Sequence, residues 1–240
     1  MLGSLVSLDN PFFLSARFMD GDARVRIKLT HEREMPLQNR VTPFSEIERS
    51  PARGLFTGNR GVLHNAEQEL VTSRWRHKAW IICELEYKGW RRKLMQPHRW
   101  TELFFLDEAT ALAAGHRPCG LCRRDAYKLF LKLSGFASAK ALDAALHAER
   151  TTLQPEIELS KLPASAMFEN RGKVYLKREE GVCEWSHFGY SGPLAMPGLT
   201  LVRPLTPPLT RLVMEAGYPA RLHPSAILDV RLDPGSVRQA

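Results

Sequence analysis

Short runs of alternating hydrophobic and polar residues occupy the segment 54–106, and we predict that this segment is built of β-strands. From Ile81 to Tyr87 every second residue is apolar, which is the period of a strand with one buried face. The sequence TELFFLD over 101–107 predicts a second strand, and Gly54, Gly58 and Gly61 punctuate shorter apolar pieces before it. The residues between these strands are therefore expected to form a β-ribbon.

After Asp107 the pattern becomes helical. Asp107 is a good N-cap for a helix that Gly115 ends, since glycine readily adopts the conformation that follows a helix. A second helix is expected to begin around Cys119–Cys122 and to run to Gly135, and a third to span 139–149. The helical part of the chain thus ends near residue 150.

The remaining segment, 151–240, is expected to be rich in short strands with a single helix. Eight of the sixteen prolines lie between Pro193 and Pro234, which excludes long helices there. Thr206 is the expected N-cap of the one helix, which Gly217 closes. We predict an α+β fold with three parts: a poorly ordered N-terminal extension over 1–34, a module over 35–150 in which a β-ribbon and short helices surround a C-x-x-C knuckle, and a β-rich region over 151–240.

Composition excludes several classes of protein. Of the 240 residues 44% are hydrophobic, which is enough for a core and argues against a disordered chain. No stretch of about 18 apolar residues predicts a membrane span, so no membrane partner is expected. The N-terminus lacks the positive charge and the uninterrupted apolar stretch of a secretion signal. We therefore expect a cytoplasmic protein.

Positive charge is concentrated between residues 71 and 100. The chain carries a net charge of +8, and this segment holds eight basic and two acidic side chains, a local excess of +6, together with four of the five tryptophans. Cationic and indole side chains on a ribbon can bind phosphates and stack on bases, which favours a nucleic-acid partner, DNA in preference to RNA. The alternative is a solvated face with cation–π contacts. The candidate contacts are Arg74, Arg76, Lys78, Trp90, Arg91, Arg92, Lys93, Arg99 and Trp100.

Cys119 and Cys122 form a C-x-x-C pair within the sequence GHRPCGLC. Two thiolates at this spacing can bind one tetrahedral Zn²⁺ from a single turn of the chain. A pair of reduced structural thiols and a redox-active pair are the alternatives, although the strand–helix–strand context of redox pairs is missing. The sequence therefore favours a zinc cofactor.

The residues around the pair resemble a known zinc module. TELFFLDEATALAAGHRPCGLCRR is similar to the second half of the Ada-type zinc-binding module, and TGNRGVLH resembles the Gly-Asn…His opening of related zinc modules of nucleases and DNA-uptake proteins. Segments from MPLQNRVTPF onward resemble a bacterial protein family of uncharacterised activity. The resemblance implies that Cys119, Cys122 and His64 bind zinc, and Cys83 would complete a Cys₃His site unless it is a buried structural cysteine.

The chain also departs from this module. The Ada-type module has two further cysteines upstream of its first long strand, whereas here no cysteine precedes Cys83. The methyl-acceptor reaction of that module uses one of the missing cysteines and is not implied.

The motifs leave the activity open. Nucleotide-binding glycine loops, a G-x-S-x-G elbow and an H-E-x-x-H zinc motif do not occur in the sequence. Three hypotheses follow: a zinc-stabilised nucleic-acid-binding protein, a metal-dependent hydrolase or nuclease that uses the region of Arg60 and His64, and a zinc-stabilised protein-interaction module. Asp107 and Glu108 are interpreted as the start of a helix rather than as catalytic acids.

Overall fold

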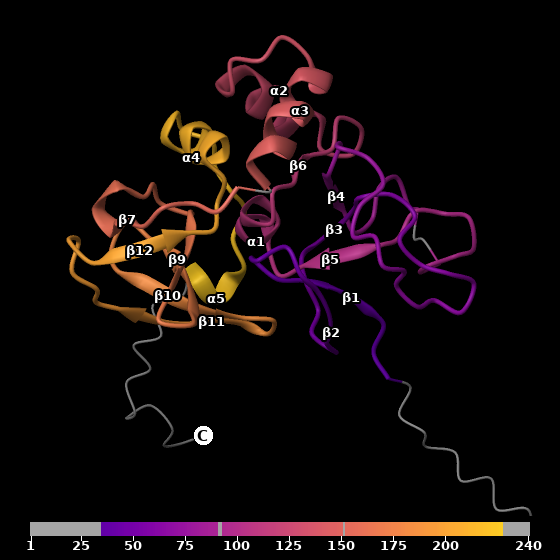
Figure 1. The fold of residues 1–240 in the computed structure, drawn as a ribbon, viewed down its shortest axis with the longest axis horizontal. Coiled ribbons are helices and arrows are strands. Elements are labelled where there is room, and N and C mark those ends of the chain that lie inside the picture. The colour runs from indigo at the N-terminus through magenta and orange to yellow at the C-terminus, as the bar shows by residue number, and fades with distance from the viewer. Residues whose placement is uncertain (1–34, 91–92, 151, 228–240) are drawn as a thin grey trace, which may run out of the picture. The chain divides into compact units, whose positions relative to one another are not determined.

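The computed structural model describes residues 35–90, 93–150 and 152–227 (Figure 1). The predicted extension over 1–34 and the candidate contacts Arg91 and Arg92 lie outside the described residues. The part of the chain that is described contains two six-stranded sheets and five α-helices, so the predicted α+β class is confirmed. None of its helices combines the length and the apolar composition that a membrane crossing requires.

The first sheet comes from the N-terminal half of the chain and has the strand order β2-β1-β5-β3-β4-β6. Its strands are β1 (Gln38–Val41), β2 (Ile47–Arg49), β3 (Phe56–Asn59), β4 (Ile81–Glu84), β5 (Leu103–Phe105) and β6 (Arg117–Pro118). The central pairs β3·β4 and β3·β5 are antiparallel, whereas β6 runs parallel to β4.

The register of this sheet separates its two faces. Phe56, Ile82 and Phe105 are fully buried and belong to the hydrophobic core. The alternate residues point to the opposite face, because side chains alternate along a strand. There Thr57 pairs with Cys83 on one neighbouring strand and with Phe104 on the other. This second face is the floor of the site described below.

The second sheet contains the strands of the C-terminal half in the order β11-β10-β9-β8-β12-β7. They are β7 (Ile157–Glu158), β8 (Met167–Asn170), β9 (Lys173–Lys177), β10 (Val182–Ser186), β11 (Gly189–Leu194) and β12 (Leu201–Pro204), and a short 3₁₀ helix, η1 (Leu159–Lys161), follows β7. The expected strand-rich character of this region is therefore present in its described residues.

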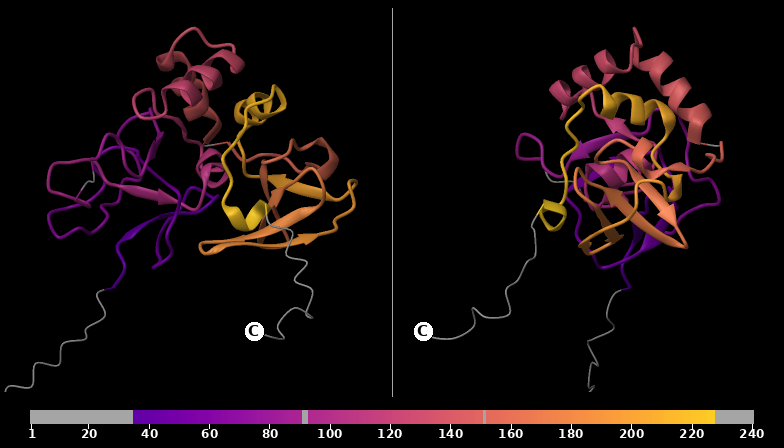
Figure 2. Two further views of the ribbon diagram at one scale, coloured as in Figure 1. Left: turned by 180° about the vertical axis from the view of Figure 1, so that it is seen from behind. Right: turned by 90° about the vertical axis from the view of Figure 1, so that its left-hand side faces the viewer.

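One helix precedes β6 of the first sheet, two lie between the sheets in sequence, and two follow the second sheet, where a single helix was expected. They are α1 (Glu108–Ala113), α2 (Arg124–Leu133), α3 (Ala139–Arg150), α4 (Pro208–Glu215) and α5 (Pro224–Ile227). Asp107 caps α1 as predicted, since its carboxylate accepts a hydrogen bond from Thr110 N, and Gly115 follows the helix with a φ of +80°. Pro207, not Thr206, is the N-cap of α4. Helices α3 and α4 pack side by side (Figure 2).

The hydrophobic core does not divide near residue 150. One cluster of buried side chains includes Leu142 and Leu146 from α3 and also Leu159, Phe168 and Val213 from the C-terminal half. Helix α1 contacts both β5 and β8, so it joins the two sheets (Figure 1). The segments expected as separate modules therefore share one core.

The basic segment is not a ribbon. Only Ile81–Glu84 of the described residues between 71 and 100 forms a strand of the sheet, and turns and bends make up most of the remainder. The alternation predicts a strand up to Tyr87, but β4 ends at Glu84, because Leu85 and Glu86 leave the sheet and are exposed. Three short turns, at residues 88–89, 94–95 and 97–98, rather than paired strands, occupy the following described residues up to Trp100.

Candidate metal centre and adjoining cavity

Three cysteines converge where β4 meets the turn that follows β6. The sulfur atoms of Cys83, Cys119 and Cys122 lie within 4.8 Å of one another. Cys119 is placed beside β4 by its backbone, because Cys119 N donates a hydrogen bond to Ile82 O (2.9 Å). Two sulfurs bound to one tetrahedral zinc are separated by roughly 3.8 Å, given Zn–S bonds of about 2.3 Å. The cluster is therefore compact enough to hold a metal ion.

Ionisation of the cluster is strongly uneven. Hydrogen bonds from the Cys122 and Cys83 thiols lower the pKa of Cys119 well below its usual range, and Leu121 N adds a further bond to Cys119 Sγ (3.4 Å). The same contacts raise the pKa of Cys83 and of Cys122. One thiolate is thus shared by two thiols, since three adjacent negative charges would repel one another. A bound dication would remove this repulsion and allow all three to ionise.

Helix α2 does not begin at the cysteines. Residues 120–123 form a turn, and α2 starts at Arg124. The amide hydrogens that reach Cys119 therefore come from the turn itself and not from the helix. The arginines that flank the turn serve structural ion pairs: Arg117 binds Asp143 through two bonds of 2.8 Å, and Arg123 binds the buried Glu108 through bonds of 2.7 and 2.8 Å.

His64 is not part of the cluster, which corrects the expected Cys₃His site. Its Nδ1 lies 2.7 Å from Thr101 Oγ1 and its Nε2 lies 3.1 Å from Gln96 O, so both ring nitrogens already have partners. His64 is buried and fixes the segment that precedes β5. Within the described part of the chain, the group of possible metal ligands consists of the three cysteines alone.

A cavity of about 740 Å³ adjoins the three cysteines. Its floor is the second face of the first sheet, with Thr57, Asn59, Ile81 and Phe104. The segment between β4 and β5 supplies the walls, and all three cysteines lie at its edge. The remaining lining residues are Arg53, Glu84, Leu85, Glu86, Tyr87, Lys88, Trp90, Leu94, Trp100, Glu102 and Leu121.

The cavity is not predicted by the periodicity of the sequence, although two of its floor residues carry part of the signal. Polar residues at 57 and 59 are unusual in a central strand, and they share the face of Cys83 once the register is known. That register depends on the pairing of strands that are distant in sequence, which the alternation of each strand alone does not provide.

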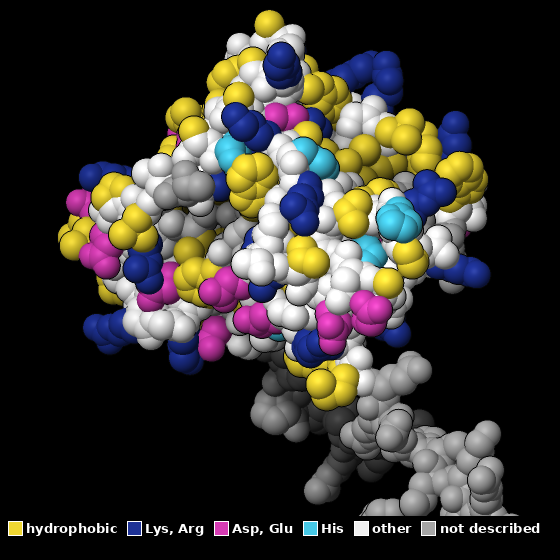
Figure 3. Space-filling view, turned by 45° about the vertical axis from the view of Figure 1, so that its right-hand side comes forward, with side chains coloured by type: hydrophobic (Ala, Val, Ile, Leu, Met, Phe, Trp, Pro, Cys, Tyr) yellow, Lys and Arg dark blue, Asp and Glu magenta, His cyan; other side chains and the backbone are white. Residues whose placement is uncertain are grey.

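Of the predicted nucleic-acid contacts among the described residues, Trp90 and Trp100 line the cavity. Trp90 is 74% exposed, and Arg74, Arg76, Lys78, Lys93 and Arg99 are also exposed. Trp100 is partly buried in the cavity wall. Figure 3 shows the side of the molecule on which these loops lie: Lys and Arg side chains are scattered among hydrophobic and histidine side chains.

Trp80, unlike Trp90 and Trp100 of the same segment, has a structural role. It is buried between two guanidinium groups, with Arg60 Cζ 4.0 Å and Arg150 Cζ 4.3 Å from its ring. Arg60 is only 1% exposed and donates to His116 Nε2 (3.1 Å) and to Ser45 O (2.9 Å). Because Arg60 and His64 are both buried and neither lines a described cavity, the geometry does not favour the hydrolase hypothesis that was based on them.

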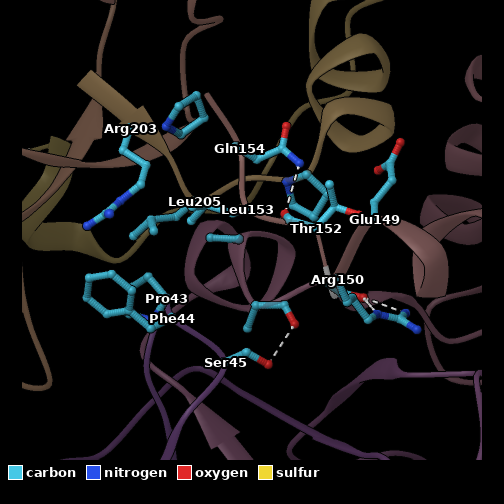
Figure 4. Close-up of a pocket in the computed structure, with 15 residues that line it drawn as sticks. Pro43, Phe44, Ser45, Glu149, Arg150, Thr152, Leu153, Gln154, Arg203 and Leu205 are labelled. Atoms are coloured by element: carbon cyan, nitrogen blue, oxygen red, sulfur yellow. Dashed lines mark hydrogen bonds between the residues drawn. The ribbon is translucent and has the colours of Figure 1, made fainter. Parts of the chain in front are cut away.

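A second cavity, of about 420 Å³, lies between the β1–β2 turn and the segments that follow α3 and β12 (Figure 4). Its charged residues already have partners: Arg150 donates to Gly115 O, Arg203 to Glu169, and Glu149 accepts from Leu209 N. The polar groups of this cavity thus stabilise the fold.

Comparison with family models, with curated proteins and with solved structures gives no match to the chain. The resemblance to the Ada-type module therefore stays a prediction.

Proposed function

We propose that the protein binds a zinc ion through Cys83, Cys119 and Cys122. The observation that supports the proposal is the convergence of three sulfur atoms within 4.8 Å. Thiolate ligands favour zinc, copper(I) and iron–sulfur clusters, and zinc is the ion most often bound by thiolates of a C-x-x-C turn. A cluster of reduced thiols suits the reducing cytoplasm, which is the location we propose.

Metal analysis of the full chain, purified without added zinc, tests this proposal. We expect about one zinc per chain, and loss of that zinc in Cys83→Ser, Cys119→Ser and Cys122→Ser. Cys183→Ser is the matched control, because Cys183 is also buried but lies in β10 of the second sheet. Wild-type protein without bound metal and with reduced thiols would contradict the proposal, as would Cys83→Ser protein that retains its full zinc content.

We propose nucleic acid as the partner of this zinc-binding protein. The specific support is the tight turn from Tyr87 to Trp90, in which Trp90 N donates to Tyr87 O (3.1 Å). Lys88 and Gly89, at its centre, have φ angles of 53° and 77°. This turn holds a cationic and an indole side chain next to each other at the cavity rim, a combination suited to phosphates and stacked bases. Single-stranded DNA is the expected partner, and binding should weaken steeply with salt.

A further inference from the structure

The cavity beside the cysteines has the size and lining of a small-molecule site. Its volume of about 740 Å³ falls within the range of roughly 300–1,000 Å³ that ligand pockets occupy. Tyr87, Trp90, Trp100 and Phe104 line it, and the cysteine cluster lies at one edge. Aromatic side chains arranged around a cavity of this size favour a flat ring as the ligand, because each face of the ring can stack.

One buried carboxylate provides polar recognition in this aromatic surrounding. Glu102 is only 4% exposed, and its Oε2 accepts a hydrogen bond from Met95 N (2.7 Å). This bond occupies Oε2, and Oε1 is not one of the buried side-chain atoms of the described residues that lack a partner. The second oxygen of a carboxylate that lines a cavity is an acceptor for an N–H group of the ligand. Glu102 therefore favours a ring that carries an amino group.

The charges around the cavity favour the same ligand. Among the described residues, three carboxylates and two basic side chains line it, and Glu84 is paired with Arg123 and Arg221. This balance does not attract an anion into the interior, whereas Arg53 and Lys88 are exposed and can meet a phosphate outside it. A neutral ring inside and a phosphate outside is the arrangement of a nucleotide within a strand.

We infer that this cavity binds an amino-bearing nucleobase, whose ring stacks on the aromatic walls and whose exocyclic amine donates to Glu102. The inference rests on the proposed zinc site, because the three cysteines that would hold the metal form part of the cavity wall. Cytosine and uracil are a matched pair for testing it. They share a ring, but cytosine presents an N–H₂ donor where uracil presents a carbonyl oxygen that a carboxylate repels.

Calorimetric titration of the full-length, zinc-analysed protein with cytidine and with uridine is the primary experiment. We expect cytidine to bind at least tenfold more tightly, since a hydrogen bond to a charged group is gained with one ligand and lost with the other. Equal affinity for the two nucleosides, or no binding of cytidine by protein that contains its metal, would overturn the inference while leaving the zinc site intact. Absence of the metal from the same sample would instead contradict the proposed function.

Two variants with matched controls locate the binding. Glu102→Gln keeps an acceptor for Met95 N but removes the charge, so the ratio of the cytidine and uridine affinities should fall towards unity. Glu180→Gln is the control, because Glu180 is exposed and lies outside the cavity lining. It should leave this ratio unchanged. Trp90→Ala should weaken binding about tenfold through lost stacking. Trp75→Ala is its control, since Trp75 is exposed but does not line the cavity. Unchanged affinity in Glu102→Gln and in Trp90→Ala would exclude this cavity as the binding site.

The source of the base is resolved by the same titration with short single strands. Binding of an oligodeoxycytidylate more tightly than of cytidine, and more tightly than of an oligothymidylate, identifies an unpaired base within a strand as the ligand. Equal affinity for the oligodeoxycytidylate and for cytidine identifies a free nucleoside. Either result supports the cavity as a nucleobase site.

Discussion

His116 is a neutral imidazole in the centre of the first sheet's packing. Its Nε2 accepts from Arg60 Nε (3.1 Å), while its Nδ1 lies 3.3 Å from Ala111 O, an arrangement in which Nδ1 carries the proton. Burial, and then the charges of Arg60 and Arg150, hold the pKa of His116 well below its usual value. The folded protein therefore does not bind a proton here at neutral or mildly acidic pH.

The stability of the protein should consequently fall as the pH is lowered through about 6.5. Unfolded chains bind a proton at His116 near this pH whereas folded chains do not, so acid favours unfolding by up to about 1.4 kcal/mol per pH unit. In His116→Gln the free energy of unfolding, measured in urea, should depend less on pH between about pH 7.5 and 5.5. The difference in slope should correspond to the uptake of close to one proton on unfolding. His77→Gln, at an exposed position, is the control, and identical slopes for wild type and His116→Gln would disprove this account.

At the scale of elements, Glu108 joins three segments that are distant in sequence. It is fully buried at the first position of α1 and forms a two-bond ion pair with Arg123, the residue after the C-x-x-C turn. From the C-terminal segment, Tyr218 Oη (2.6 Å) and Arg221 N (2.9 Å) also donate to it. The position of the cysteine turn thus depends on α1 and on the chain that follows α4.

Glu108→Gln should be strongly destabilising, by about 3–5 kcal/mol, because it removes the two-bond counter-charge of the buried Arg123 and leaves that guanidinium only the partly exposed Glu84 at 3.2 Å. Tyr218→Phe removes a single hydrogen bond to the same carboxylate and should cost about 1 kcal/mol. Urea unfolding of the two variants measures both values, with the exposed Glu179→Gln as the reference for a neutral substitution. The network is not stabilising if Glu108→Gln lowers the free energy of unfolding by less than about 1 kcal/mol and Tyr218→Phe leaves it unchanged.

The elements that could be predicted from the sequence are those determined by local signals. Helix α1 with its Asp107 cap, and α3 over nearly the expected residues, follow from capping and periodicity. The ribbon prediction was wrong because apolar residues beyond Glu84 cover a cavity instead of pairing in a sheet. Convergence of Cys83 with the C-x-x-C turn was only one of the alternatives, since it depends on the parallel pairing of β4 with β6. Glu102 and the aromatic walls depend in the same way on tertiary contacts.

For the whole molecule, the net charge of +8 favours an anionic partner, and its distribution decides which surface makes contact. Lys78, Lys93 and Arg99 are exposed in the segment between residues 71 and 100. A second set of exposed lysines, Lys128, Lys132 and Lys140, lies on α2 and α3. These two sets carry the same charge. Comparing variants of the two sets therefore distinguishes a local binding surface from a general electrostatic attraction.

Neutralising the first set should reduce the salt dependence of single-strand binding far more than neutralising the second. Each phosphate contact contributes about 0.7 to the slope of log K against log salt concentration, so a Lys78→Gln, Lys93→Gln, Arg99→Gln triple variant should lower the slope by roughly 2. The Lys128→Gln, Lys132→Gln, Lys140→Gln variant changes the net charge equally and should keep the wild-type slope. Fluorescence anisotropy with an oligodeoxycytidylate over a range of salt concentrations measures both slopes. Equal reductions in the two variants would mean that the net charge alone, and not the basic segment between residues 71 and 100, attracts the strand.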